Sequence, residues 1–296
     1  MSFKRTCALL CTATLCSSPA AADENLFGYV KGSETLPEGA WELYQIVTNR
    51  RDKSVGHYSA WDSLTELEYG VTDSFNVNAA VLGRSIDTSG LMIDGYLPGD
   101  KDSGLKFAGL ELGAKYNFLA PALNDFGLTG YWELDYSNTD PHSGQDKDTL
   151  SFGSLLIMQK YFMEGQIVWA GNLGLEATWA RRGPIDGLPA DFEWPTDPEM
   201  EIELLAGTAI TYRFVPNWYL GAEIVYETEF ETEVGQERWS VFAGPTLHYG
   251  SQKWWATFTW FPQLRGGGES FEGQDPDLHL IEKTETEYRF KLGFNF

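Results

Sequence analysis

Histidine and serine are the residues of this sequence best suited to covalent chemistry, and their spacing argues against it. A hydrolase needs an imidazole within reach of a serine hydroxyl, with a third group that orients the imidazole. His142 and Ser143 are adjacent, but they fall in a polar stretch with no regular element to hold them. His248 lies on a predicted strand too far from Ser240, on the same face, to suggest a triad. The other two histidines, His57 and His279, fall in polar connections.

Other catalytic and cofactor motifs are missing from the sequence. It contains no Gly-x-Ser-x-Gly elbow and no His-Glu-x-x-His pair, and Gly266–Gly268 lacks the lysine of a phosphate loop. The three cysteines, Cys7, Cys11 and Cys16, all precede the predicted cleavage site of a leader. The exported chain therefore has no disulfide and no cysteine-based metal site. We predict neither an enzyme nor a bound cofactor.

Carboxylates are the abundant reactive groups. The sequence has 43 Asp and Glu residues against 21 Lys and Arg, a net charge of −22, and loss of Lys4 and Arg5 with the leader makes it −24. Such a charge excludes nucleic acid as a partner. Much of the excess falls in four polar stretches: Asp94 to Asp102, Asp140 to Asp148, Asp186 to Glu203 and Glu269 to Asp277.

These acidic stretches have two interpretations. The simpler one is a solvated acidic surface. The alternative is that they recruit Ca²⁺ or Mg²⁺, hard cations that bind oxygen ligands and also bridge lipopolysaccharide phosphates. Asp100-Lys-Asp102-Ser-Gly104 is similar to the start of a calcium loop but lacks its remaining ligands, so no metal site is assigned.

The N-terminus predicts export. Lys4 and Arg5 precede a short apolar stretch and then small residues at Ala20 and Ala22, the layout of a signal peptide over residues 1–22. Residues 23–38 are rich in glycine and polar groups, and they are expected to lie in the periplasm or inside the lumen of the folded protein. Residues 39–296 are expected to form the main domain.

The sequence of that domain predicts β-strands. The chain ends on Tyr288-Arg-Phe290-Lys-Leu292-Gly-Phe294-Asn-Phe296, where every second residue is large and apolar. Side chains alternate faces with period two in a strand, so this segment has one apolar face. No stretch approaches the 18 or more apolar residues of a membrane-spanning helix. Since only helices and closed barrels satisfy their backbone groups in lipid, the sequence predicts a transmembrane antiparallel up-and-down β-barrel.

Alternation and breaker residues predict about twelve strands with short periplasmic turns and long extracellular loops. An even strand number and sorted connections are typical of bacterial outer-membrane barrels and have no reason to occur in a β-sandwich. The strands are expected near residues 39–48, 60–70, 75–84, 105–118, 126–137, 149–161, 166–179, 200–213, 218–229, 238–249, 253–263 and 285–296. The registers of the first and sixth strands stay open, because bulky residues occupy both of their faces.

The faces of the strands divide the side chains between lipid and lumen. Aromatic residues predicted at the two membrane interfaces are Trp61, Trp179, Trp239 and Trp260 on the outer side, and Trp218, Trp254 and Phe296 on the periplasmic side. Residues predicted to line the lumen are Glu66, Glu68, Glu111, Glu133, Asp135, Glu176, Glu201, Glu203, Glu223 and Glu227, with the bases Arg84, Lys115, Arg213, His248, Arg289 and Lys291.

An acidic lining has two functional interpretations. A water-filled lumen of this kind would prefer cations, since carboxylates raise the local cation concentration. This predicts a passive, cation-preferring channel for small solutes. The alternative is a structural or adhesive outer-membrane protein with a closed lumen, ion pairs across its strands and exposed acidic loops. Twelve strands lie between the eight that side chains fill and the sixteen of a broad pore, so their number leaves both open.

Three segments carry a resemblance to a known family. Phe27–Tyr44, Glu66–Asp73 and Gly244–His248 resemble a family of uncharacterised proteobacterial outer-membrane barrels grouped as a domain of unknown function. The Glu66–Asp73 turn is also similar to turns of barrels that import aromatic or hydrophobic compounds. The resemblance implies the fold and an outer-membrane location, with lipid and lipopolysaccharide around the barrel and the barrel-assembly machinery acting on its C-terminal strand. It implies no substrate and no catalytic residues.

Overall fold

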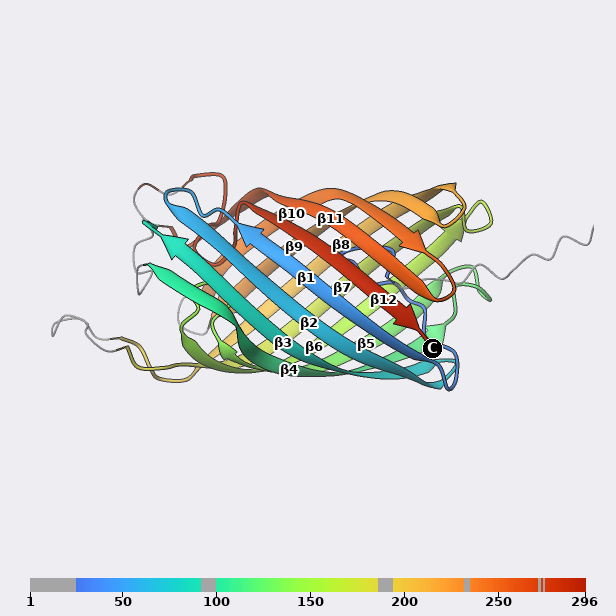
Figure 1. Cartoon of the computed structure of the whole chain (residues 1–296), viewed down its shortest axis with the longest axis horizontal. Coiled ribbons are helices and arrows are strands. Elements are labelled where there is room, and N and C mark those ends of the chain that lie inside the picture. Colours follow the sequence, from blue (N-terminus) through green and yellow to red (C-terminus); the bar gives the residue numbers. More distant parts are fainter. Residues whose placement is uncertain (1–24, 92–99, 186–193, 232–234, 271–272, 274) are drawn as a thin grey trace, which may run out of the picture.

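Twelve antiparallel strands form the regular structure of the chain, in a computed structural model that describes residues 25–91, 100–185, 194–231, 235–270, 273 and 275–296. Figure 1 shows them running obliquely around a single barrel. The predicted leader, residues 1–22, lies outside the described residues. The strands are β1 (Trp41–Arg51), β2 (His57–Thr72), β3 (Phe75–Ser89), β4 (Lys101–Leu119), β5 (Gly127–Thr139), β6 (Asp146–Phe162), β7 (Ile167–Arg182), β8 (Glu199–Val215), β9 (Trp218–Glu231), β10 (Gly235–Gly250), β11 (Trp254–Gly268) and β12 (Thr286–Asn295).

The barrel closes between its first and last strands. Each strand pairs with its neighbours in chain order, and β12 pairs antiparallel with β1. Trp41 and Phe296 exchange backbone hydrogen bonds of 2.9 and 3.0 Å at one end of this seam. Closure removes the unpaired edges that an open sheet would expose. The predicted twelve-stranded antiparallel barrel is confirmed. Among the described residues, no helix has the length and apolar character needed to cross a membrane.

The strands are longer than predicted at the end that carries the long connections. β3 runs to Ser89 rather than ending near residue 84, and β11 runs to Gly268 rather than 263. These extensions are mostly polar or glycine, with Ile86 and Leu264 as single apolar residues. A ladder that projects beyond lipid meets water on its outer side, so it needs no regular alternation that would reveal it. His57, expected in a connection, is the first residue of β2. At the opposite end the turns span only two to seven residues, as in the periplasmic turns of such barrels.

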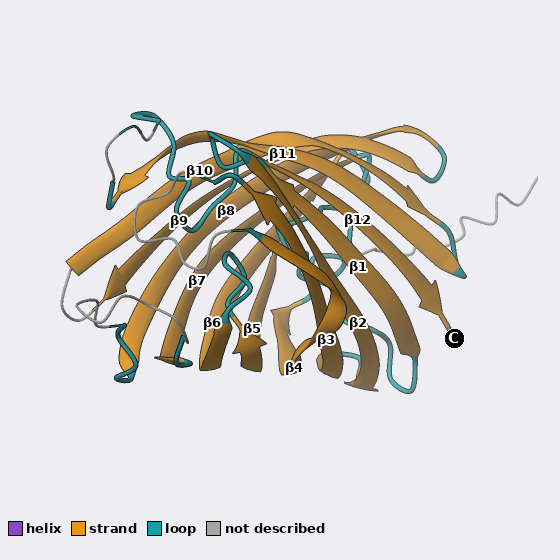
Figure 2. Cartoon of the chain, turned by 60° about the vertical axis from the view of Figure 1, so that its left-hand side comes forward, coloured by secondary structure: helices purple, strands orange, loops and turns teal. Residues whose placement is uncertain are grey.

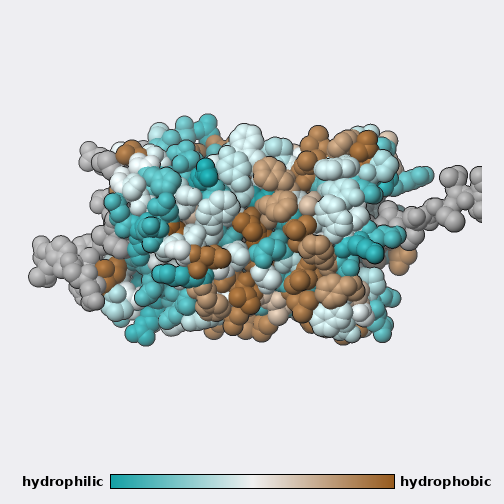
Figure 3. Space-filling view, viewed as in Figure 1, coloured by the Kyte–Doolittle hydropathy of each residue, from teal (hydrophilic) through white to brown (hydrophobic). Residues whose placement is uncertain are grey.

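Large apolar side chains cover the outside of the barrel. Leu112 on β4 has 58% of its surface exposed, and Leu173 on β7 and Phe258 on β11 are also exposed. Figure 3 shows apolar residues gathered over the middle and the turn end, with hydrophilic residues gathered at the end of the long connections. A closed sheet that turns its apolar residues outward is an integral membrane barrel of the outer-membrane type.

Burial settles the registers of the two ambiguous strands. On β1, Trp41 and Leu43 are exposed while Glu42 and Tyr44 are buried, so the odd-numbered residues of that segment face lipid. On β6, alternate residues near its middle behave the same way: Leu150, Phe152 and Leu156 are exposed, and Ser151 and Ile157 are buried.

Six of the seven predicted interface aromatics are well exposed on the outer face, and Trp239 is half-buried. Trp218, Trp254 and Phe296 lie at the short-turn ends of β9, β11 and β12. The outer set lies further from the strand ends than expected, and Trp260 falls in the middle of β11, because the strands continue beyond the residues that alternate. Their role as membrane anchors stays a prediction.

Candidate functional site

The lumen is occupied by the segment that follows the predicted leader. Residues 25–35, called the plug here, run along the inside of the barrel and contact strands from all around it. Three consecutive backbone N–H groups, of Gly28, Tyr29 and Val30, donate to the carboxylate of Glu223 on β9 at 2.9, 2.8 and 3.0 Å. A Cβ at Gly28 would lie 2.5 Å from the hydroxyl of Thr259, so this close approach needs glycine.

Further along the plug, its backbone bonds to side chains of the wall. Asn172 on β7 accepts from the N–H of Lys31 at 2.7 Å and donates to the carbonyl of Lys31 at 2.9 Å. Gln159 on β6 accepts from the N–H of Ser33 at 2.7 Å, and Thr129 on β5 donates to the Ser33 carbonyl. The wall therefore supplies the backbone partners that a strand or helix would otherwise supply.

Tyr29 of the plug borders all three cavities of the lumen described below. Its ring stacks on Phe261 with centroids 4.1 Å apart, and the guanidinium of Arg289 lies 3.7 Å above it. Its hydroxyl donates to Glu287 at 2.7 Å. An apolar cluster on the same side, which includes Phe27 and Phe242, joins the plug to β7, β8, β9, β10 and β11. On this side the plug and the wall share a packed core.

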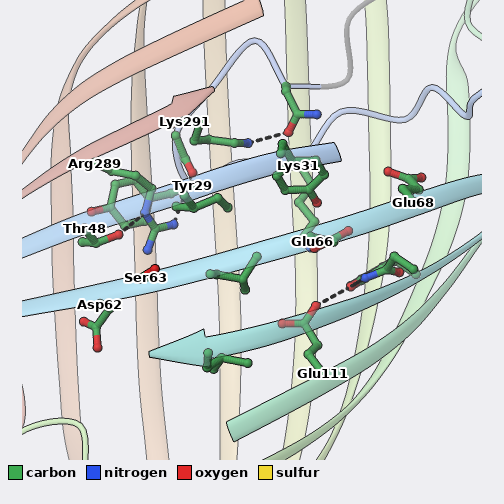
Figure 4. A pocket seen from close by; sticks show the side chains of 18 of the residues that line it. Tyr29, Lys31, Thr48, Asp62, Ser63, Glu66, Glu68, Glu111, Arg289 and Lys291 are labelled. Atoms are coloured by element: carbon green, nitrogen blue, oxygen red, sulfur yellow. Dashed lines mark hydrogen bonds between the residues drawn. The ribbon is translucent and has the colours of Figure 1, made fainter. Parts of the chain in front are cut away.

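The inward faces of β1, β2, β3 and β12, called the paired wall, carry acids and bases in contact. Asp62 accepts from Arg50 and from Arg84, each at 2.6 Å. Arg289 also donates to Thr48 at 2.9 Å, and Lys291 donates to Asn25 of the plug at 2.5 Å. Figure 4 shows Arg289 and Lys291 approaching the plug from one side and Glu66 and Glu68 facing the same space.

The inward faces of β4 to β8, called the acid wall, place carboxylates beside one another. Glu111 lies directly opposite Asp135 in the β4–β5 pairing, and Glu176 lies opposite Glu203 in the β7–β8 pairing. Glu133 projects from β5 next to Gly153, where a Cβ would meet its side chain at 2.8 Å. Adjacent carboxylates at this spacing repel one another unless protons or cations lie between them.

Three cavities surround the plug. One of about 260 Å³ lies between the plug and the paired wall and reaches Glu111; another of about 130 Å³ lies between the plug and the acid wall, against Glu133 and Glu176. A third, of about 380 Å³, lies toward the long connections above Tyr29. Each volume exceeds the share of a single water molecule and each lining is polar, so the lumen has room for solvent on both sides of the plug.

Two connections fold into the outer mouth, and Figure 2 looks toward that end. In the connection between β5 and β6, Pro141 and His142 lie against Arg50, whose guanidinium donates to the Pro141 carbonyl at 2.5 Å and lies 3.2 Å from His142. The connection before β12 is held by Lys53, which lies between β1 and β2. Its ammonium donates to the carbonyls of Leu280, Ile281 and Lys283 in that connection.

Burial in the mouth changes how its histidines titrate. Burial, and then the nearby Lys53 and Arg50, lower the pKa of His142 well below its ordinary value. Burial, and then Arg238, lower the pKa of His279 to about 3. Both histidines were expected in solvated loops; instead the connections bend inward, where cationic neighbours hold the imidazoles neutral.

Most of the predicted lining residues lie in the lumen, and they fall on different parts of its wall. Glu66, Glu68, Arg84, Arg289 and Lys291 lie on the paired wall; Glu111, Lys115, Glu133, Asp135, Glu176, Glu201 and Glu203 lie on the acid wall; Glu223 binds the plug; Glu227 lies at the outer mouth; Arg213 and His248 lie near the short turns. His248 contacts Thr257 at 2.8 Å, and Ser240 makes no side-chain hydrogen bond to any described residue, so the two do not form a catalytic pair.

Several lumen residues were not anticipated. Asn172 and Gln159 bind the plug backbone, and Arg50, Lys53 and Gln263 hold the connections in the mouth. A uniform polar face of a strand gives no signal of which amide will meet a distant loop. The glycine-rich composition of residues 23–38 was the available hint that this segment could approach a wall closely.

Some predicted regions fall partly outside the described residues. The acidic stretches Asp94 to Asp102, Asp186 to Glu203 and Glu269 to Asp277 are described only in part, so the alternative that they bind Ca²⁺ or Mg²⁺ stays a prediction. The stretch Asp140 to Asp148 is described, and the carboxylate of Asp140 accepts from the backbone of His142 and Ser143.

Fold and lumen together define the class: an outer-membrane-type barrel with an acidic interior and its own N-terminal segment inside. Within that class, the chain belongs to a family of unknown function, DUF6662, whose profile matches residues 19–296. The search of curated proteins returned no match.

Solved structures share the fold. The COG4313 outer membrane channel from Pseudomonas putida F1 superposes with a TM-score of 0.57 at 16% identity, covering 89% of this chain and 98% of that one. The β domain of the Bordetella autotransporter BrkA superposes with a TM-score of 0.55 at 11% identity, covering 88% and 100%. At these identities the likeness extends to the barrel architecture and no further.

Proposed function

We propose that this barrel is a passive, cation-preferring channel for small solutes in the bacterial outer membrane, with the plug narrowing the route. The observation that carries the proposal is the acid wall. Three carboxylates, on Glu111, Glu133 and Glu176, lie beside water-sized cavities rather than inside a packed core, and Asp135 lies opposite Glu111 in the sheet. If the lumen served only to make the barrel rigid, neutral or paired side chains at these positions would make the fold more stable than unpaired carboxylates do.

The way the plug is held supports a conducting role as well. Its apolar contacts lie against β7 to β11, and Asn172 and Gln159 hold its backbone, yet cavities remain between the plug and both the paired wall and the acid wall. The plug therefore leaves room for solvent on both of its sides, as a narrowed route requires. A fold neighbour is itself described as an outer membrane channel, which is in keeping with the proposal.

No catalytic role forms part of the proposal: His57 lies against Asp87, His142 against Arg50 and His248 against Thr257. The surrounding partners are lipid and lipopolysaccharide, and insertion depends on the barrel-assembly machinery acting through β12. The rival function is a structural or adhesive protein with a closed lumen, which the hydrogen bonds of the plug favour.

Planar-bilayer recording on purified, refolded protein separates the two functions. Discrete openings, with a reversal potential under a KCl gradient that favours K⁺ over Cl⁻, are the expected result. An anion-favouring potential would contradict the charge argument. A silent bilayer, from protein that migrates as a folded barrel on unheated gels, would favour the structural or adhesive role.

A further inference from the structure

Three glutamates meet at the outer mouth, where β9, β10 and the connection before β12 come together. The side chains are Glu229 on β9, Glu237 on β10 and Glu282 on the connection, and each offers a carboxylate oxygen within 4.8 Å of the other two. Glu229 and Glu237 are only 6% and 8% exposed. Carboxylates gathered this closely away from solvent need a counter-charge between them.

Glu237 is the unusual member of this group. It lies at the shift in register between Gln236 and Arg238, where β10 has one residue more than β9. Such a bulge lets two successive side chains turn to the same face, and Glu237 and Arg238 are both buried. The Oε2 atom of Glu237 is buried and has no hydrogen-bond partner. An orphaned carboxylate oxygen is costly to bury, so its retention points to a ligand.

The basic groups present do not neutralise this region. Arg238 pairs with Glu229, with Glu282 at 2.7 Å and with Glu203 at 3.3 Å. Lys283 pairs with Glu227. Five carboxylates thus face these two basic side chains, with Lys53 near Glu282, and Glu237 pairs with neither Arg238 nor Lys283. Arg238 orients one oxygen of Glu229 and one of Glu282, which leaves their second oxygens for another partner.

We propose that Glu229, Glu237 and Glu282 bind one divalent cation, with Ca²⁺ as the best fit. Ca²⁺ accepts six to eight oxygen ligands in flexible geometry, whereas Mg²⁺ demands a near-ideal octahedron. The three carboxylates come from two strands and a connection, and water would supply the remaining ligands. Such an irregular set suits Ca²⁺ better than Mg²⁺. The bound ion ties the connection before β12 to the barrel wall and offsets the excess negative charge of the mouth.

A second trio nearby provides a contrast. Glu199, Glu201 and Glu231 also place carboxylate oxygens within 4.8 Å of one another, but all three are partly exposed. Lys147 lies 2.8 Å from Glu201, and Arg182 lies 2.9 Å from Glu199. The Oε1 atom of Glu199 is buried without a hydrogen-bond partner, but it lies 3.7 Å from the ammonium of Lys147. Basic groups therefore already face this trio, and it is not part of the site.

Calcium titration of the full mature barrel in detergent, after treatment with EDTA and its removal, tests the proposal. We expect isothermal titration calorimetry with CaCl₂ to report one site per chain. Glu237→Gln and Glu282→Gln should each weaken Ca²⁺ binding by about tenfold or more, since each removes a direct ligand. Glu231→Gln, which removes the same charge from the same rim, should change the affinity less than about twofold. Glu282 lies on a connection, so its variant keeps the test valid if Glu237→Gln fails to fold.

Two results would overturn the proposal. Equal losses in Glu231→Gln and Glu237→Gln would mean that Ca²⁺ collects in the general field of the acidic mouth. No calcium binding by the wild type at pH 8, with an unfolding temperature unchanged by EDTA, would mean that a shared proton rather than a cation separates Glu229 from Glu237.

Discussion

The two walls of the lumen bury charge in opposite ways. On the paired wall, Asp62 bridges Arg50 and Arg84, so each charged group is compensated by a neighbour. On the acid wall, Glu111 faces Asp135 and Glu176 faces Glu203, so like charges adjoin across the strands. Both walls are built from the same alternating strand pattern. The difference teaches that alternation decides which residues enter the lumen, while their pairing decides whether the lumen keeps a net charge.

The plug depends on this difference. Arg289 and Lys291 on the paired wall donate to Gly28 and Asn25 of the plug, and three backbone N–H groups of the plug donate to Glu223 on β9. On the opposite side, Asn172 and Gln159 hold the backbone of the plug beside carboxylates that adjoin an open cavity, and Lys31 lies over the ring of Tyr131 at 4.0 Å. A cation-selective route is expected between the plug and the acid wall.

Removal of the plug is the largest test of that division. Deletion of residues 25–35 takes away the segment that fills the centre of the lumen, including Tyr29 stacked on Phe261. We expect single-channel conductance to rise several-fold while the preference for cations persists, because the acid wall stays in place. Planar-bilayer recording at a fixed KCl concentration measures both quantities. An unchanged conductance would place the constriction elsewhere, in the connections at the mouth.

Gly28→Val displaces the plug without deleting it. We expect single-channel conductance in planar-bilayer recording to rise again, by less than on deletion of the plug. A side chain there would meet Thr259, with Glu223 close behind at 3.1 Å, so the three N–H donors should detach from Glu223. Its matched control is Gly39→Ala in the adjoining turn, where no atom lies within 4 Å of an added Cβ; its positive φ adds strain outside the lumen only.

The paired wall should show its contribution in stability. Asp62→Asn leaves the guanidiniums of Arg50 and Arg84 without their shared carboxylate, and we expect the free energy of unfolding to fall by about 3 kcal/mol. Urea titration followed by tryptophan fluorescence in lipid vesicles measures the change. The control is Asp87→Asn on β3, whose contact with His57 is exposed and should contribute less than about 1 kcal/mol.

The sequence predicted the barrel and the facing of its strands because both follow from a period of two, as at Leu110 and Leu112 against Glu111. It could not predict the contents of the lumen. The bonds of Gln159 and Asn172 to the plug join residues more than a hundred positions apart, and they depend on backbone groups that every residue carries. The inward folding of His279 could not be predicted either. A polar connection has the same sequence pattern whether its backbone binds water or, as here, the side chain of Gln263.

The folded-in connections should weaken in acid. The pKa of His279, about 3, and that of His142, also lowered, lie below the 6.5 of an exposed histidine, so the opened connections bind protons more readily than the folded ones. The stability of the mouth is therefore complete above pH 6.5 and falls as the pH drops toward 3, at about 1.4 kcal/mol per pH unit for each histidine at most. Limited proteolysis of residues 278–285 at pH 7.5 and 5.5 should reveal faster cleavage in acid. In His279→Asn the acceleration should shrink; an equal acceleration would assign it to other groups.

The smallest expected effect isolates the acid wall. Glu133→Gln combined with Glu176→Gln removes two negative charges beside the cavity that separates this wall from the plug. We expect the permeability ratio of K⁺ to Cl⁻ to fall about threefold, because lining carboxylates set the local cation concentration. Glu66→Gln with Glu68→Gln removes the same charge from the paired wall and should move the ratio less, since the basic groups of Arg289 and Lys291 line the same cavity as these two acids. Equal shifts from the two double variants would mean that the whole lumen acts as one uniform field, and the distinction between the walls would then have no consequence for conduction.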